Sequence, residues 1–347
     1  MVRVENISKK LGEFFLRNVS LDVALGEYFM ILGPTGSGKT ILLETIAGIY
    51  PPDKGRVYLN DRDITELPPR KRNIGMVYQD YMLFPHLNVE ENIKYGMRSR
   101  KYSKQEVSQK VDKLADLLGI SHLLGRHPVT LSGGEKQRIA IARALIMEPE
   151  VLLLDEPLSA LDSETRVKLR KELRRIHSVT HTTMVHVTHG FDEAFLLGNR
   201  MAIMHNGEIV QMGEPSDVFR KPNCKFVAEF LGVTNVFQGE AVIDDGNSCI
   251  NVNGLKIRSA TPRDGKVYAS VRPEDILVSL KPIESSARNF FQGEIQDISN
   301  AGTVLRITVD AGIPLVAAIT RRSFLDMGLK QGQQVFLTFK AADVHVF

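Results

Sequence analysis

The chain has 347 residues, of which 43% are hydrophobic and 24% are charged, and 44 basic against 41 acidic residues give a formal net charge of +3. This composition is typical of a soluble globular protein with room for two or more domains, and it excludes a disordered or fibrous chain. The near balance of charge argues against nucleic acid as the main partner. Aliphatic runs such as residues 151–154 are far shorter than the roughly 18 residues of a membrane span, and the N-terminus lacks the apolar core of a signal peptide. We therefore expect a cytoplasmic protein that reaches a membrane only through a partner.

Residues 1–232 alternate strand-like and helical segments, which predicts an α/β domain. Apolar runs at residues 28–32, 74–77, 151–154 and 183–187 predict strands, and an apolar face along residues 104–118 predicts a helix. Residues 233–347 instead contain short apolar runs separated by Gly, Asp, Asn and Pro, which predicts a small all-β barrel or a pair of barrels. The first part holds 32 basic and 29 acidic residues and the second part 12 of each, so the excess charge lies in the α/β domain.

The segment between the strand at residues 28–32 and a helix expected at residues 41–47 matches the phosphate-loop pattern in full. Its glycines allow successive backbone N–H groups to turn toward phosphate oxygens, and the N-terminus of the following helix favours an anion. We expect Lys39 to reach the terminal phosphates of ATP and Thr40 to ligate Mg²⁺. The ATP-binding residues of this phosphate loop are Gly33, Pro34, Thr35, Gly36, Ser37, Gly38, Lys39 and Thr40.

The strand at residues 151–154 ends in two adjacent carboxylates, Asp155 and Glu156. Four aliphatic residues in a row are typical of a central parallel strand that is covered on both faces. Ligands bind at the carboxyl ends of strands in open α/β sheets. We therefore expect Asp155 to support Mg²⁺ and Glu156 to polarise the water that attacks the γ-phosphate.

Between the phosphate loop and the second strand lies the sequence Leu131-Ser132-Gly133-Gly134-Glu135, followed by a helix-compatible stretch at residues 136–147. With this signature segment, residues 1–232 resemble the ATP-binding subunits of ABC transporters. Further motifs match the same family in the expected order. They are Gln79 of the glutamine loop, Asp162 of the D-loop and His189 as the switch histidine.

The resemblance implies an ABC-type P-loop ATPase domain with a helical subdomain at about residues 84–150. It also implies a head-to-tail homodimer, in which Ser132, Gly133, Gly134 and the Asp162 loop of one chain close over the ATP that its partner binds. Two further residues would contact the bound ATP and Mg²⁺. Gln79 would sense Mg²⁺ and the attacking water, and His189 would hold the γ-phosphate in line with Glu156.

The sequence departs from the family pattern at two positions. The aromatic residue that usually stacks on adenine is replaced by Leu11, which leaves Phe14 or Phe15 as the substitute. The signature segment ends in Glu135 where many relatives have Gln, and we expect this change to leave the phosphate contacts of Ser132 intact. Residues 81–95 resemble the surface on which importer ATPases receive a short helix of the membrane subunit.

The C-terminal part resembles barrel extensions of importer ATPases. The sequence Val-Arg-Pro-Glu-Asp at residues 271–275 is common to several importer classes, including those for sugars and polyamines. Residues 285–289, 293–295, 318–320 and 339–341 look like the OB-like TOBE/Mop-type barrel that binds molybdate or tungstate. A tetrahedral dianion needs converging N–H and O–H donors and a compensating cation. The donors expected here are Ser286, Ala287, Arg288, Thr320 and Lys340, with Ala342 where relatives often have a serine.

The resemblance thus implies an ATP-hydrolysing subunit that powers an ABC importer of molybdate or tungstate, with the barrel at residues 233–347 sensing cytoplasmic oxyanion and inhibiting transport. Its partners would be a second copy of the chain, transmembrane permease subunits and, indirectly, an extracytoplasmic oxyanion-binding protein. This places it at the cytoplasmic face of the membrane. One alternative is an importer of sulfate, sugar or polyamine with a purely structural barrel. Another is an ABC ATPase acting on nucleic acid or ribosomes, which the neutral tail disfavours.

Overall fold

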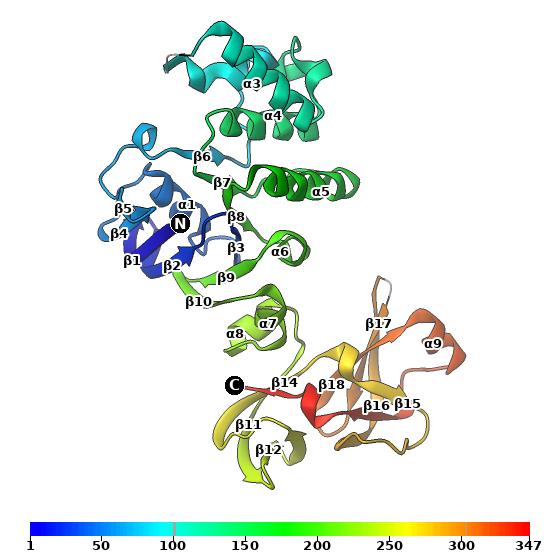
Figure 1. Cartoon of the computed structure of the whole chain (residues 1–347). Helices are drawn as coiled ribbons and strands as arrows, with labels where there is room; N and C mark the ends of the chain where they lie inside the picture. The colour runs from blue at the N-terminus through cyan, green and yellow to red at the C-terminus, as the bar shows by residue number, and fades with distance from the viewer. Residues whose placement is uncertain (100–101, 303) are drawn as a thin grey trace. The chain divides into compact units, whose positions relative to one another are not determined.

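The computed structural model describes residues 1–99, 102–302 and 304–347, and it divides into two compact units, Met1–Val218 and Phe219–Phe347 (Figure 1). The division falls within α7 (Pro215–Arg220). The boundary that the sequence predicts near residue 232, between the ATPase domain and the barrel, stays a prediction. Among the described residues, no helix combines the length and the apolarity needed to cross a membrane.

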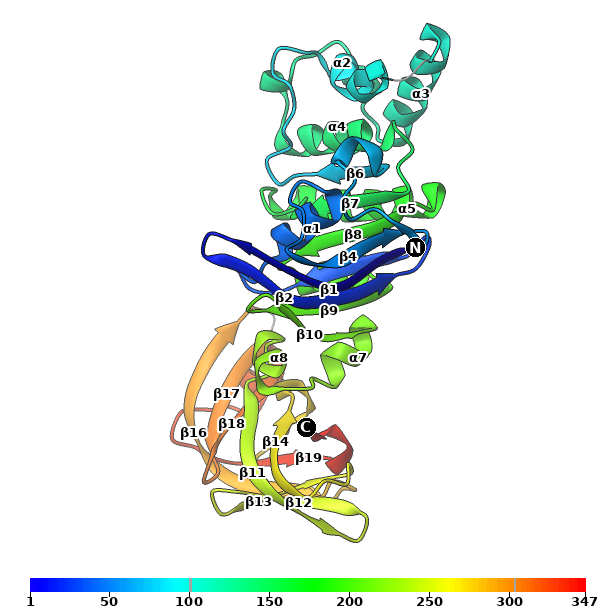
Figure 2. The same cartoon turned by 90° about the vertical axis from the view of Figure 1, so that its left-hand side faces the viewer.

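The first unit is built on a six-stranded sheet with the order β10-β9-β3-β8-β7-β6, in which only β10 is antiparallel to its neighbour. Every residue of β3, β7 and β8 is buried, as expected of strands covered on both faces. Figure 2 shows β6, β7 and β8 following one another across the sheet. The strands are β3 (Tyr28–Leu32), β6 (Ile74–Val77), β7 (Val151–Asp155), β8 (Thr183–Thr188), β9 (Arg200–His205) and β10 (Glu208–Gly213).

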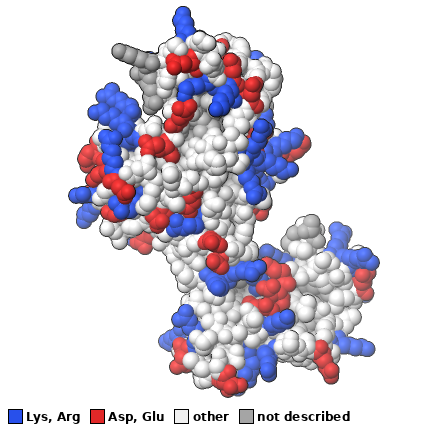
Figure 3. Space-filling model, in the orientation of Figure 1, with Lys and Arg blue, Asp and Glu red and all other residues white. Residues whose placement is uncertain are grey.

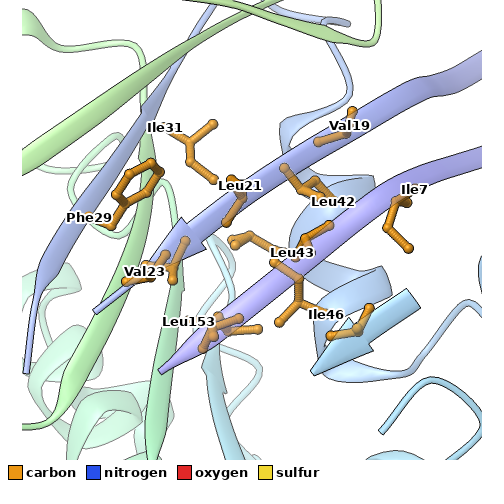
Figure 4. Close-up of a cluster of buried hydrophobic side chains, with 14 of the residues drawn as sticks. Ile7, Val19, Leu21, Val23, Phe29, Ile31, Leu42, Leu43, Ile46 and Leu153 are labelled. Carbon is orange, nitrogen blue, oxygen red and sulfur yellow. The ribbon is translucent and has the colours of Figure 1, made fainter. Parts of the chain in front are cut away.

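A second sheet of the first unit is antiparallel, with the order β2-β1-β4-β5. Its apolar side chains, among them Ile7 and Leu21, pack against Phe29 of β3 and Leu43 of the helix after the phosphate loop (Figure 4). This shared core fixes the position of that helix against both sheets. The strands are β1 (Val2–Leu11), β2 (Phe14–Val23), β4 (Lys54–Leu59) and β5 (Arg62–Asp63).

Three helices of the first unit, α2, α3 and α4, begin at capping boxes. Asn88, Ser103 and Ser132 each form a capping box with the glutamate three residues later. The expected helix at residues 104–118 is α3, whose Val111 and Ala115 are buried. The helices are α1 (Lys39–Ala47), α2 (Val89–Ile93), α3 (Lys104–Leu117), α4 (Gly133–Leu145), α5 (Ser163–Thr180) and α6 (Phe191–Leu197).

The second unit has two five-stranded antiparallel sheets around one apolar core. Their orders are β13-β12-β11-β14-β20 and β15-β19-β16-β17-β18. Two buried asparagines join the sheets: the amide of Asn235 bonds Val271 and Val316, and that of Asn289 bonds the backbone of Arg258. The α/β fold class followed by an all-β domain is thus confirmed.

The strands of the second unit are β11 (Asn235–Asp244), β12 (Asn247–Val252), β13 (Leu255–Ser259), β14 (Gly265–Val271), β15 (Leu277–Ser279), β16 (Asn289–Ala301), β17 (Val304–Asp310), β18 (Pro314–Thr320), β19 (Gln334–Phe339) and β20 (His345–Val346). Its helices are α8 (Lys225–Phe230) and α9 (Arg321–Asp326). On the face of each unit seen in Figure 3, basic and acidic side chains are interspersed.

Candidate active site

The predicted ATP-site residues follow four parallel strands that end at the same edge of the six-stranded sheet. The register pairs Leu32 of β3 with Thr188 of β8, and Asp155 of β7 with Val187 of β8. β6 runs parallel to β7 and ends beside it. The structure therefore brings one set of predicted residues to this edge: the phosphate loop with Lys39 and Thr40, then Gln79, Asp155, Glu156 and His189.

The phosphate loop has the backbone that its glycines allow. Gly36 and Gly38 have φ values of 83° and 98°, which side chains disfavour. A Cβ on Gly33 would collide with the carbonyl oxygen of Met204 and lie 2.7 Å from Ser37 Oγ. Gly38 precedes α1 and has no side chain to cap it, so the first N–H groups of α1 face outward toward any anion in the loop.

Lys39 is held within this loop rather than in solvent. Its ammonium donates hydrogen bonds to the carbonyl oxygens of Gly33 (2.8 Å) and Pro34 (2.9 Å), and the side chain is buried. Burial lowers the pKa of Lys39, while Glu156 and Asp155 oppose that shift. An incoming phosphate group would replace two neutral carbonyl acceptors with charged ones, which form stronger hydrogen bonds.

Two oxygen donors at the sheet edge fit a magnesium ion. The hydroxyl of Thr40 donates to Asp155 Oδ1 at 3.1 Å, and Asp155 is buried. Burial raises the pKa of Asp155, so its charged form lacks compensation that a cation would supply. Among the described residues, no group of three or more His, Cys, Asp or Glu side chains could hold a metal ion. A hydroxyl, one carboxylate and nucleotide phosphates are the ligands that Mg²⁺ takes in such sites.

Glu156 and His189 face each other beside this pair. Glu156 Oε2 lies 3.3 Å from His189 Nδ1. Glu156 also has a φ of 42°, a left-handed conformation that costs about 1–3 kcal/mol in a non-glycine residue. Hydrogen bonds hold it there, because its N–H donates to Val187 and its carbonyl accepts from the hydroxyl of Ser159. Such strain is typical of residues at functional sites.

The signature segment lies elsewhere, at the start of α4. Ser132 caps α4, and no hydrogen bond joins it to the phosphate loop among the described residues. Glu135 accepts hydrogen bonds from both the N–H (2.7 Å) and the hydroxyl (2.8 Å) of Ser132. Glu135 would therefore compete with a nucleotide phosphate for the hydroxyl of Ser132, and the sequence alone did not predict this contact. Gly133 and Gly134 lie close to the D-loop and α5, because added Cβ atoms would meet Leu161 and Thr165.

Gln79 and the two candidate adenine partners are solvent-accessible. Gln79 is exposed just beyond β6. Phe14, at the tip of the β1–β2 hairpin opposite Leu11, is 53% exposed, whereas Phe15 is half-buried with the guanidinium of Arg17 over its ring. The backbone of Phe15 borders Gly38 of the phosphate loop, so the β1–β2 hairpin lies beside the nucleotide site. Phe14 and Phe15 are consecutive residues of a strand, so their rings point to opposite faces.

The expected oxyanion-binding residues fall into two groups within the chain. Asn289 pairs with Phe339, so the adjoining Arg288 and Lys340 lie together at the beginning of β16, with Ser286 and Ala287 just before them. Thr320 pairs with Val304, which pairs with the far end of β16. Thr320 also caps α9. A single chain therefore does not gather all five predicted residues.

The sequence did not predict a cluster of three buried polar side chains beneath the active-site edge of the sheet. Tyr28 of β3, His186 of β8 and Glu193 of α6 are all buried. The Tyr28 hydroxyl lies 2.9 Å from His186 Nδ1, and His186 Nε2 lies 3.5 Å from Glu193 Oε2. A histidine in the middle of an otherwise apolar strand was the signal that could have indicated it.

Comparisons with known proteins agree with this geometry. The sequence profile of the ABC transporter family matches residues 16–159, and that of the TOBE domain matches residues 285–346. The chain is 47% identical to the molybdate/tungstate import ATP-binding protein of Pyrococcus horikoshii, over the whole of both chains. It is 38% identical to the Fe(3+) ions import ATP-binding protein of Fusobacterium nucleatum, over all of this chain and 93% of that protein.

One solved structure with a similar fold is an ATP-binding cassette in a dimeric, post-hydrolysis state bound to ADP and Pi. It is 31% identical, with a TM-score of 0.56, and the match covers 62% of this chain and 99% of that one. The chain therefore belongs to the ABC transporter family, among its ATP-binding proteins. More narrowly, it is an import-type ATPase subunit with a C-terminal TOBE domain, as the sequence predicted.

Proposed function

We propose that this ATPase powers import of molybdate or tungstate, and that its second unit senses cytoplasmic oxyanion and inhibits transport. The observation that carries the cargo assignment is the 47% identity to a molybdate/tungstate import ATP-binding protein along the full length of both chains, including the TOBE domain. The Fe(3+) import relative matches the same length at 38%. The ATPase chemistry is common to both, so the cargo assignment depends on the higher identity to the molybdate/tungstate protein.

In the proposed reaction, the phosphate loop binds the phosphates of ATP through backbone N–H groups and Lys39. Thr40 and Asp155 would hold Mg²⁺, with Gln79 as a further contact, and the ion would supply positive charge to the phosphate oxygens. Glu156 accepts a hydrogen bond from the attacking water, and its carboxylate lies 3.3 Å from His189 Nδ1. His189 then orients the γ-phosphate in line with that water.

The proposed catalytic unit is a homodimer. Ser132 and the two following glycines lie at a helix N-terminus, where an anion binds well, yet no hydrogen bond joins Ser132 to the phosphate loop among the described residues. A second copy in head-to-tail orientation supplies this anion site to the ATP of its partner, with Asp162 nearby. Replacing Glu156 by Gln removes the base but keeps ATP binding, so it should trap an ATP-bound dimer. Size-exclusion chromatography with ATP measures this, and a monomeric, fully active Glu156→Gln variant would refute both roles.

The proposed permease contact is the loop at residues 82–88. Buried Asn92 fixes its shape, because the side-chain amide bonds the backbone of Phe84 and Leu87. Phe84 packs against Tyr95 at 4.3 Å, and Met82 and Tyr95 remain exposed. An ordered loop with exposed apolar side chains is suited to receive a partner helix. This contact places the subunit at the cytoplasmic face of the membrane, and an external binding protein delivers the oxyanion to the permease.

We place the oxyanion site between the barrels of two chains. Arg288 and Lys340 at one end of β16 supply cations, with Ser286 and Ala287 beside them, and Thr320 of the second copy supplies a hydroxyl. Inhibition requires that the anion bind the ATPase-inactive arrangement more tightly than the active one, because equal affinity shifts nothing.

Mixing two inactive variants tests this arrangement. Arg288→Ala and Thr320→Val chains each lose molybdate binding when alone. In mixed dimers one of the two sites combines an intact Arg288 with an intact Thr320, so binding returns in part. Isothermal titration of the full-length chains with molybdate, tungstate and sulfate measures both stoichiometry and cargo class. Absence of recovery on mixing contradicts the shared site, and tighter binding of sulfate favours the alternative importer class.

A further inference from the structure

Thr188, His189 and Gly190 form a turn between β8 and α6, here called the switch turn, and Glu193 lies under it. Glu193 is 6% exposed and its N–H donates to the carbonyl of Gly190. Thr188 is 3% exposed, and its Oγ1 accepts the N–H of Gly190 at 3.0 Å. Burial raises the pKa of Glu193, and a hydrogen bond from the Thr188 side chain to its carboxyl group opposes that shift. The turn is therefore tied to Glu193 in two ways, by the backbone N–H of Glu193 at Gly190 and by its carboxylate at Thr188.

The other side of the Glu193 carboxylate faces the buried pair formed by Tyr28 and His186. Burial raises the pKa of Tyr28 well above its usual value and lowers the pKa of His186 to about 3, so both are neutral near pH 7. A neutral phenol donates its proton to His186 Nδ1, which places the imidazole proton on Nε2, 3.5 Å from Glu193 Oε2. The opposite tautomer would leave the buried Tyr28 proton without an acceptor, at a cost of about 1–3 kcal/mol.

These contacts join the strand of the phosphate loop to the switch turn. Tyr28 begins β3, which leads into the phosphate loop, and His186 lies on the adjacent strand β8. The space beneath the turn is full, because a Cβ on Gly190 would lie 3.3 Å from the Glu193 carboxyl carbon and 3.5 Å from Thr188 Oγ1. Among the described residues His186 Nε2 makes no hydrogen bond, so its 3.5 Å contact with Glu193 Oε2 is electrostatic. Glu193 fills the space under the turn, and His189 Nδ1 on the turn lies 3.3 Å from Glu156 Oε2.

We propose that Glu193, acting through Thr188, is a positioning residue for ATP hydrolysis that fixes the switch turn so that His189 meets Glu156 and the γ-phosphate. This inference rests on the role proposed above for His189. The carboxylate is suited to the task because it accepts from the Thr188 hydroxyl while facing the Nε2 proton of His186. A glutamine of the same shape presents an N–H to one of these donors, so it cannot satisfy both.

The test compares ATP hydrolysis by the full-length chain in matched variants. Thr188→Val keeps the shape and removes the hydroxyl, whereas Thr188→Ser keeps the hydroxyl. Thr183→Val is the control, because Thr183 is equally buried at the other end of β8 and accepts the N–H of Gly26. Glu27→Gln is the corresponding control for Glu193→Gln, since Glu27 is a buried glutamate outside the site.

We expect Thr188→Val and Glu193→Gln to lower kcat by about tenfold with the KM for ATP unchanged, as loss of one positioning hydrogen bond implies. Thr188→Ser should retain kcat, and the two controls should lower thermal stability without lowering kcat. In a His189→Ala background, Glu193→Gln should add no further loss of kcat, because both changes act on the same group.

Two results overturn the inference and separate it from the underlying site assignment. If His189→Ala loses activity while Glu193→Gln and Thr188→Val keep full kcat, the positioning role is wrong and the role of His189 stands. If Glu193→Gln lowers kcat further in the His189→Ala background, Glu193 does not act through His189. Full activity of His189→Ala removes both the positioning role and the proposed site role. Should Glu193→Gln fail to fold, the Thr188 pair carries the same comparison.

Discussion

Glu135 should weaken ATP binding at the signature segment, and Glu135→Gln should strengthen it. Hydrogen bonds from Ser132 lower the pKa of Glu135, so its carboxylate is charged at neutral pH. A γ-phosphate oxygen accepting from Ser132 Oγ would lie about 2.7 Å from that hydroxyl. Because Glu135 Oε2 lies 2.8 Å from the same oxygen atom, the two anions would be at most about 5.5 Å apart.

This separation sets the size of the effect. Two unit charges about 5.5 Å apart repel by about 0.8 kcal/mol in water and about 3 kcal/mol at an effective dielectric constant near 20. The exposed signature segment is close to the lower limit. Removing the charge should therefore lower the ATP concentration for half-maximal hydrolysis by about fivefold, and the difference should shrink as salt is added.

A matched glutamate separates electrostatics from capping. Glu106 forms the same box with Ser103 at the start of α3, with the Ser103 N–H 2.7 Å from Glu106 Oε2. Glu106→Gln should disturb its helix as Glu135→Gln does, and it should leave the KM for ATP unchanged. Steady-state hydrolysis at several salt concentrations measures both variants. Identical KM values for Glu135→Gln, Glu106→Gln and the unmodified chain would refute the reasoning.

Three further outcomes follow from buried groups. Gly33→Ala should abolish ATP binding in a fluorescent-nucleotide assay, because its Cβ would collide with the carbonyl of Met204; normal affinity would contradict the loop geometry. Arg72 is 2% exposed and its guanidinium bonds four backbone carbonyls. Because each hydrogen bond to a charged group contributes about 1.5–3 kcal/mol, Arg72→Met should lower the free energy of unfolding by about 3–5 kcal/mol in urea denaturation, and a loss below about 1 kcal/mol would contradict this. Because burial lowers the pKa of His186 from 6.5 to about 3, the unfolded chain takes up a proton that the folded chain does not. Stability should thus fall as pH drops below about 6.5, by up to about 1.4 kcal/mol per pH unit, and His186→Gln should flatten that slope in thermal melts.

Local patterns were enough to predict most of the first unit. The strands at residues 28–32 and 74–77 match β3 and β6 to the residue, because each is a short apolar run bounded by a charged or polar residue and a turn. The phosphate loop was predictable for a related reason. Its conformation is determined by glycines such as Gly36 and Gly38, whose positive φ values are written into the motif itself.

Contacts between distant residues were not predictable in the same way. His186 and Tyr28 meet because β3 and β8 are adjacent, a pairing of strands 158 positions apart that no local pattern specifies. The separation of Thr320 from Arg288 depends on the register along β16, which donor chemistry does not reveal. Nor does a Gln-to-Glu difference at Glu135 disclose its hydrogen bond to Ser132, because that requires the rotamer of the capping box.

Arg143 of α4 joins the signature helix to the loop proposed to contact the permease. Its guanidinium donates to the carbonyls of Met82 (2.7 Å) and Tyr81 (3.0 Å) and lies over the ring of Phe84. The same loop follows Gln79, so a shift of the permease contact moves the signature helix and the glutamine loop together. Arg143→Met should therefore keep basal ATP hydrolysis by the isolated chain and lose the stimulation by cargo in the reconstituted transporter. Arg138→Met is the control, because Arg138 lies on the same helix but pairs with Glu172 of α5. Equal stimulation in the two variants would mean that the signal does not pass through Arg143.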